Sequence, residues 1–135
     1  TKLLHMALAK GATEIITGAF LNLSAVCDHL IQMNKPVILG CAAWKDRVNI
    51  EDTLFAGAVA DRIYDHFHVA CDASHLARNM YQLAKDDLYE FMKVNEASHY
   101  HRLTNFGLEK DIRHCLTPDL ANVLPEYSNG KLILQ

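Results

Sequence analysis

Residues 14–41 read EIITGAFLNLSAVCDHLIQMNKPVILGC, and this segment determines which fold the sequence predicts. Its first five residues, 14–18, are rich in β-branched side chains and end in a glycine, a pattern typical of a strand. Asn22 can then cap a helix whose apolar side chains recur at helical spacing as far as Asn34. The apolar run at residues 37–39 lacks alternation, which favours a strand buried on both faces. A strand, a helix and a second strand predict an α/β fold, layered α/β/α around a largely parallel or mixed sheet.

The rest of the chain adds helical patterns and a hairpin. Apolar side chains at helical spacing predict a helix over residues 50–67 and a longer one over residues 72–94. Two short helices are expected beyond them. Gly57 lies between two alanines and would let another element approach closely. Asn129-Gly130 between two apolar runs predicts a C-terminal β-hairpin.

The composition is that of one ordinary globular domain. The chain has 135 residues, 50% of them hydrophobic and 21% charged, and roughly 100 to 200 residues make one domain. A net charge of -3 argues against a nucleic-acid partner and against an electrostatic membrane anchor. The longest apolar stretch, residues 37–44, is far shorter than the roughly 20 residues of a membrane span. Four separated cysteines without a C-x-x-C pair predict a reducing, cytoplasmic setting.

Glu51 and Asp52 form the first candidate site. Two carboxylates just past a strand end can hold a hard divalent cation beside a phosphate group. The same residues also fit a structural role, because Asn49 resembles a helix N-cap and acidic residues in a first turn favour the helix dipole. Asp52 would then bind back to Asn49 in a contact like a capping box. The sequence leaves both interpretations open.

Cys41 and Arg47 have the C-x5-R spacing of cysteine-dependent phosphatases. Such loops turn their backbone amides toward a phosphate while a thiolate of low pKa attacks it. The loop here contains the bulky Trp44, the negative Asp46 and no glycine. A buried structural thiol is therefore the competing interpretation of Cys41.

Two histidine-containing segments complete the candidates. His68, Cys71 and His75 would share one face of a continuous helix and suit zinc, whereas a new helix starting between them would separate them. Farther along, the segment SHYHR places Ser98 and Arg102 at i and i+4, where they can share a helix face and bind an anion together. A solvated polar face is the alternative for this segment.

Several short motifs are similar to those of one family and keep their order along nearly the whole chain. They are Asn22-Leu23-Ser24-Ala25-Val26, Cys41-Ala42-Ala43, EDTLFAGA at residues 51–58, SHYHRL at residues 98–103, Gly107, Lys110-Asp111-Ile112, Cys115, Asp119 and Val123-Leu124-Pro125. On these motifs the sequence resembles the magnesium-dependent 2-phosphosulfolactate phosphatases.

The resemblance implies a function and a set of site residues. It implies an α/β enzyme that hydrolyses a phosphate monoester, 2-phosphosulfolactate, to sulfolactate and phosphate, a step of coenzyme M formation. It implies Mg²⁺ as the cofactor, with Glu51 and Asp52 as its ligands and as the catalytic residues. Contacts to this small-molecule phosphate ester would come from Thr1, Asn22, Cys41, Ser98, His99 and Arg102.

Thr1 resembles the last residue of the family's T-N-G-T turn. We therefore expect residues 1–135 to be a single α/β domain, the C-terminal portion of a longer phosphatase. This portion is expected to be inactive alone. A homo-oligomer is compatible with the sequence. Two other functions stay open. A non-catalytic binding or assembly domain would use Glu51 and Asp52 as helix caps and would hold no divalent ion beside them. A hydrolase with Cys41 as nucleophile would keep its activity in EDTA and lose it with a thiol alkylator.

Overall fold

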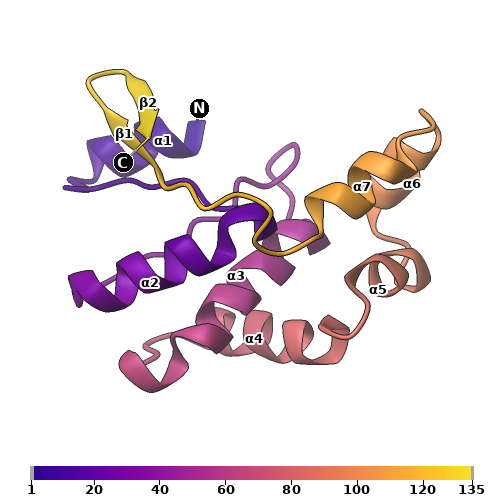
Figure 1. Ribbon diagram of the computed structural model, residues 1–135, viewed down its shortest axis with the longest axis horizontal. Coiled ribbons are helices and arrows are strands. Elements are labelled where there is room, and N and C mark those ends of the chain that lie inside the picture. Colours follow the sequence, from indigo (N-terminus) through magenta and orange to yellow (C-terminus); the bar gives the residue numbers. More distant parts are fainter. Residues whose placement is uncertain (1, 135) are drawn as a thin grey trace.

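The structure, a computed structural model, describes residues 2–134 and is mainly helical (Figure 1). The helices are α1 (Lys2–Ala9), α2 (Leu23–Met33), α3 (Ile50–Arg62), α4 (Asp72–Ala84), α5 (Leu88–Val94), α6 (Ser98–Thr104) and α7 (Glu109–Cys115). Short 3₁₀ turns, η1 (Phe20–Asn22) and η2 (Tyr64–His66), precede α2 and follow α3. The strands are β1 (Pro125–Ser128) and β2 (Lys131–Leu134). No helix in this part of the chain is long and apolar enough to cross a membrane.

The expected α/β fold, with α/β/α layers around a parallel or mixed sheet, is wrong. Over residues 2–134 the sheet consists of β1 and β2 alone, paired antiparallel. The strand expected at residues 14–18 makes only one isolated bridge, in which Ile16 lies antiparallel to Glu126. Beside this bridge the Thr17 amide donates to the Pro125 carbonyl at 2.9 Å. The first extended segment therefore borders the hairpin instead of starting a parallel sheet.

The second expected strand, residues 37–39, is not a strand either. Val37 and Leu39 are half-buried against the helical core, whereas Ile38 between them is 95% exposed. An apolar run of this length suits an extended segment lying across helices as well as it suits a buried strand. Periodicity alone does not separate the two, and this is the physical reason for the error.

The C-terminal hairpin is present as predicted. β1 and β2 pair with Ser128 opposite Lys131, and the connection consists of Asn129 and Gly130. These two residues have φ values of 50° and 84°, the left-handed backbone that a tight two-residue hairpin turn requires.

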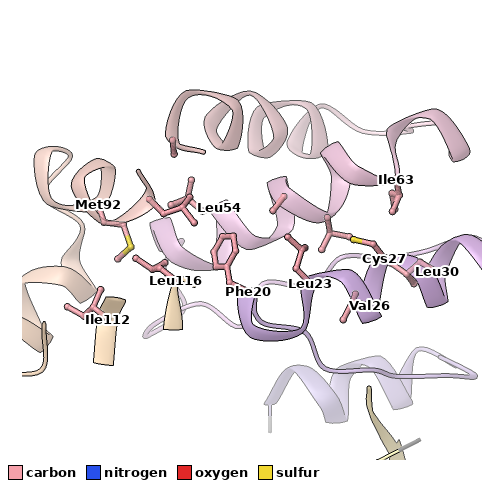
Figure 2. Packing of buried hydrophobic residues seen from close by; sticks show 14 of the residues in the cluster. Phe20, Leu23, Val26, Cys27, Leu30, Leu54, Ile63, Met92, Ile112 and Leu116 are labelled. Carbon is pink, nitrogen blue, oxygen red and sulfur yellow. The ribbon is translucent and has the colours of Figure 1, made fainter. Parts of the chain in front are cut away.

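The core lies between α2, α3 and the segments that pack on them (Figure 2). Leu23 and Cys27 of α2 point toward α3 and are at most 4% exposed. Leu54 and Val59 of α3 are completely buried. Burial raises the pKa of the Cys27 thiol to about 11, so this cysteine is a structural, protonated side chain. The helical spacing of apolar residues in both segments predicted this packing.

Two helix ends differ from the prediction. The helix expected over residues 50–67 ends at Arg62, and η2 follows it. The helix expected over residues 72–94 is interrupted between α4 and α5. Asp87 starts α5 there, because its side chain accepts the Glu90 N–H at 2.9 Å as an N-cap.

Gly57 brings α3 and α4 into close contact. A Cβ atom at this position would lie 2.1 Å from the Ala77 carbonyl oxygen and 2.9 Å from the Tyr81 Cβ. The side chain of any other residue would therefore collide with the backbone of α4. This confirms that Gly57 permits the close approach of another element. The contact fixes the position of α3, whose first turn carries the candidate site.

Candidate functional site

Asn49 is the N-cap of α3. Its Oδ1 accepts the Asp52 N–H at 2.9 Å, and its Nδ2 donates to Asp52 Oδ2 at 3.2 Å. Asp52 Oδ2 also accepts the Ala43 N–H at 2.8 Å. The predicted capping contact is therefore present, and the Asp52 carboxylate ties the preceding loop to the start of α3.

That loop, residues 43–47, is a tight turn. The Trp44 and Arg47 backbones exchange hydrogen bonds at 3.0 Å in both directions. Lys45 and Asp46 at its tip have φ values of 52° and 59°, and Ala43 has a φ of 64°. Such left-handed values are uncommon for residues other than glycine and asparagine, so the surrounding contacts must hold this shape.

Four side chains from this loop, α3 and α6 form what we call the polar cluster: Trp44, Glu51, His99 and Arg102. His99 Nδ1 contacts Glu51 Oε1. The Trp44 ring lies edge-on to the His99 ring, with 5.4 Å between centroids. The Arg102 Cζ lies over the Trp44 ring, 4.2 Å from its centroid. The structure thus brings together three predicted site residues, Glu51, His99 and Arg102.

Three polar atoms of this cluster are buried without a hydrogen-bond partner: Glu51 Oε2, His99 Nε2 and Arg102 Nε. Among residues 2–134 no other side-chain nitrogen or oxygen is in this state. Leaving such a group unpaired costs about 1 to 3 kcal/mol, and buried polar groups usually have a protein, water or ion partner. Their gathering at one place makes the polar cluster the candidate binding site of the residues that the structure describes.

Burial, and after it the positive charge of Arg102, lower the pKa of His99. Both effects favour the neutral form of the ring. In the neutral form only one ring nitrogen carries a proton, and Nδ1 is the nitrogen that faces Glu51 Oε1. A proton on Nδ1 can be donated to Glu51, and this tautomer leaves Nε2 free to accept a proton.

An apolar cavity of about 360 Å³ reaches the acidic start of α3. Its walls include Phe20, Leu30 and Phe55, and its charged lining residues are Glu51 and Asp52. Glu51 therefore belongs both to the polar cluster and to the cavity lining, and Asp52 lines the cavity beside it.

Cys41 also lines this cavity but does not have the properties of a nucleophile. Desolvation and then the Asp52 carboxylate raise the pKa of its thiol, and Sγ–H donates to the Asp52 carbonyl at 3.6 Å. A raised pKa lowers the thiolate fraction. The Ala43 amide, which a phosphate loop would turn toward its anion, is bonded to Asp52 instead. These observations disfavour a hydrolase with Cys41 as nucleophile.

Other predicted site residues lie outside the contacts of the polar cluster. Ser98 is exposed at the first position of α6. Thr1 lies outside the residues that the structure describes. Substrate binding by both stays a prediction. In the zinc candidate a new helix, α4, begins directly after Cys71, and residues 2–134 contain no group of three or more His, Cys, Asp or Glu side chains arranged for a metal.

Asn22 is 5% exposed and bonds to three backbone groups. Its Oδ1 accepts the Ala19 N–H at 2.8 Å, and its Nδ2 donates to the Val123 carbonyl at 3.0 Å and the Thr17 carbonyl at 3.3 Å. These bonds join the segment before α2 to the segment before β1. A role of Asn22 in substrate binding stays a prediction.

Replacing Asn22 with alanine should lower the free energy of unfolding by about 1 to 3 kcal/mol, because buried backbone groups lose their partners. Urea denaturation followed by circular dichroism would measure the loss. Asn122→Ala is the matched control, since Asn122 is exposed and a surface change of this kind stays within about 0.5 kcal/mol. Equal stability of the two variants would contradict the structural role of Asn22.

Comparison with known proteins shows the family. The family model described as 2-phosphosulpholactate phosphatase matches residues 1–130. A probable 2-phosphosulfolactate phosphatase of Thermotoga maritima is 36% identical over 122 residues, which are 90% of this chain and 52% of that protein. Probable 2-phosphosulfolactate phosphatases of Caldanaerobacter subterraneus and Synechocystis are each 32% identical, over 88% and 87% of this chain and 49% of each relative.

The chain spans about half the length of the relatives that it matches. The family match itself extends over nearly all of its residues and includes the whole polar cluster. The chain therefore belongs to the 2-phosphosulpholactate phosphatase family.

Proposed function

We propose that this chain takes part in the Mg²⁺-dependent hydrolysis of a phosphate monoester, with 2-phosphosulfolactate as its substrate. The observation that carries the proposal is the gathering of unpartnered buried polar atoms in the polar cluster of a chain from a phosphatase family. Phosphate hydrolysis can use an arginine to bind the phosphate group and an imidazole to take a proton from the attacking water. A carboxylate can hold a cation that balances the negative charge of the phosphate. The choice of substrate is supported by the names of the similar proteins.

Glu51 fits the role of a Mg²⁺ ligand better than Asp52 does. Glu51 Oε2 is buried without a partner, whereas Asp52 Oδ2 already accepts two hydrogen bonds. Mg²⁺ commonly keeps several waters and binds one or two carboxylates together with substrate phosphate oxygens, so a single free carboxylate suits it. When bound, the ion would neutralise negative charge on the phosphate. In this proposal Asp52 acts by holding the loop at residues 43–47.

Arg102 and His99 would act on the reactants. The Arg102 guanidinium can donate two parallel hydrogen bonds to phosphate oxygens. His99 Nε2 can accept a proton from the attacking water while Glu51 holds Nδ1. The water oxygen then bonds to phosphorus, the ester bond between phosphorus and oxygen breaks, and the leaving alkoxide takes the proton that His99 Nε2 accepted, which restores the neutral imidazole.

The direct test is phosphate release from 2-phosphosulfolactate by the gene product that carries residues 1–135. We expect turnover that requires Mg²⁺, stops in EDTA and persists after thiol alkylation. Activity that continues in EDTA and stops on alkylation would support Cys41 as nucleophile instead. If no phosphate ester is hydrolysed at any Mg²⁺ concentration, the chain is a binding or assembly domain.

Replacing Arg102 with lysine should raise KM by roughly 5- to 150-fold, because an ammonium keeps the charge but loses the planar pair of donors. The kcat should change less. Arg113→Lys is the control: Arg113 also lies over an aromatic ring, with its Cζ 3.6 Å from the Tyr89 centroid, but it belongs to α7 and not to the polar cluster. A KM equal to that of the unmodified enzyme would show that Arg102 does not contact the substrate.

A further inference from the structure

We propose that Trp44 is a positioning residue that orients the Arg102 guanidinium toward a tetrahedral oxyanion of the substrate, a phosphate or a sulfonate group. The inference deepens the proposed function and rests on it for the identity of the substrate class. In the sequence Trp44 is only a bulky residue that does not suit a phosphate loop.

The stacking geometry explains how an indole can orient an arginine. A guanidinium donates its hydrogen bonds in its own plane, so a ring on its face leaves the donor edge free. Arg102 Cζ lies over the Trp44 ring, and Arg102 Nε is buried and unpartnered. The ring restricts the rotation of the side chain and thereby limits the directions in which Nε–H and the neighbouring N–H can point.

A second arginine–aromatic pair, Arg78 and Tyr64, provides a comparison in which the arginine already has a carboxylate partner. Arg78 lies over Tyr64 with its Cζ 3.7 Å from the ring centroid, much like Arg102 over Trp44. The donor edge of Arg78 is occupied, because its Nε donates to Asp61 at 2.8 Å. Arg102 Cζ likewise lies over an aromatic ring, but Arg102 Nε has no carboxylate partner. Arg102 Nε therefore still has a proton to donate, and an anion from outside the chain could accept it.

The loop at residues 43–47 supplies the means of holding Trp44 in place. The Asp52 carboxylate fixes Ala43, and the backbone pairing of Trp44 with Arg47 closes the turn. Lys45 adds a second positive charge, with its Nζ 5.9 Å from the centroid of the Trp44 ring. The cation of Arg102 and the nearby cation of Lys45 both favour an anionic ligand at this place.

Calorimetric titration of the same gene product with inorganic phosphate tests the proposal. Trp44→Leu should weaken phosphate binding by roughly 2- to 30-fold, the range expected for loss of a cation–π contact. Trp44→Phe keeps an aromatic face and should restore the affinity to within about threefold. Tyr89→Leu removes the ring under Arg113 in the same way and is expected to leave phosphate binding unchanged.

Trp44 is the single tryptophan of the chain, so its emission reports on this site directly. Phosphate should change the emission with a midpoint that equals the calorimetric Kd, and Arg102→Ala should abolish both signals. A merely structural tryptophan would not respond. Methanesulfonate in place of phosphate distinguishes the two oxyanions: the stronger response names the group that Arg102 binds, and either response supports the proposal.

Two results would overturn the inference. One is wild-type phosphate affinity in Trp44→Leu together with lost binding in Arg102→Ala, since Arg102 would then need no orientation by the ring. The other is an unchanged Kd in all variants. Both leave the proposed function intact if phosphate ester hydrolysis is still observed. Conversely, Trp44-dependent oxyanion binding without turnover would support the inference and contradict the proposed hydrolysis.

Discussion

Glu51→Gln is expected to lower kcat/KM at least about 100-fold, a loss of roughly 2.7 kcal/mol of transition-state stabilisation. Glutamine keeps an oxygen that can accept a hydrogen bond from His99 Nδ1, but it removes the negative charge on which a Mg²⁺ ligand depends. Folding should be nearly unaffected, because the cap of α3 is Asn49. Steady-state kinetics at several Mg²⁺ concentrations would measure the loss, and high Mg²⁺ should restore part of it.

Asp52→Asn is the matched control at the adjacent carboxylate. Its Oδ2 binds Asn49 and Ala43, so the change should lower the melting temperature by a few degrees and disturb the loop that carries Trp44. The resulting rise in KM should not respond to Mg²⁺. A Glu51→Gln enzyme that turns over at the normal rate in low Mg²⁺ would contradict the site and make Glu51 an ordinary acidic residue of a helix start.

Gly57→Ala is expected to reduce the free energy of unfolding by about 3 kcal/mol, near the upper end of the range for overpacking. The new methyl group would meet the Ala77 carbonyl oxygen at 2.1 Å, and backbone atoms cannot rotate out of its way. The sign of the change in the free energy of unfolding is informative, because replacing glycine with alanine inside an exposed helix stabilises the helix by about 1 kcal/mol. Urea denaturation would measure the change.

Ala56→Gly, at the preceding position of α3, provides the control. It should cost only the helix propensity difference, about 0.5 to 1 kcal/mol. A Gly57→Ala protein that is more stable than the unmodified chain would contradict the close contact between α3 and α4.

Features of the fold that depend on neighbouring residues were predictable from the sequence. The Asn49 cap, the Asn129-Gly130 hairpin and the packing role of Gly57 follow from local backbone and side-chain preferences, and all three are present. The absence of strands at residues 14–18 and 37–39 could not be predicted in this way. A strand exists only if another segment pairs with it, and an apolar run does not say whether such a partner is available.

In the candidate site, too, the residue types were predictable from the sequence but the long-range contacts were not. The residue types of Glu51, His99 and Arg102 identified them as candidates, but helical spacing suggested Ser98 as the companion of Arg102. In the structure the companion is Trp44, from a loop far away in the sequence. The contact between Glu51 and His99 is also long-range. No periodicity in a single sequence links such positions, so the assembly of the site could not be read from it.

The polar cluster joins a loop and a helix start to α6, and the whole of α4 and α5 lies between them in the chain. Closing so long a segment costs conformational entropy, which the packing of the intervening helices must offset. A collapsed folding intermediate with formed helices but an undocked α6 would possess neither the histidine–carboxylate contact nor the stacked arginine. The proposed anion binding would consequently require the completed native state, and partly folded forms of the chain would not bind the ligand.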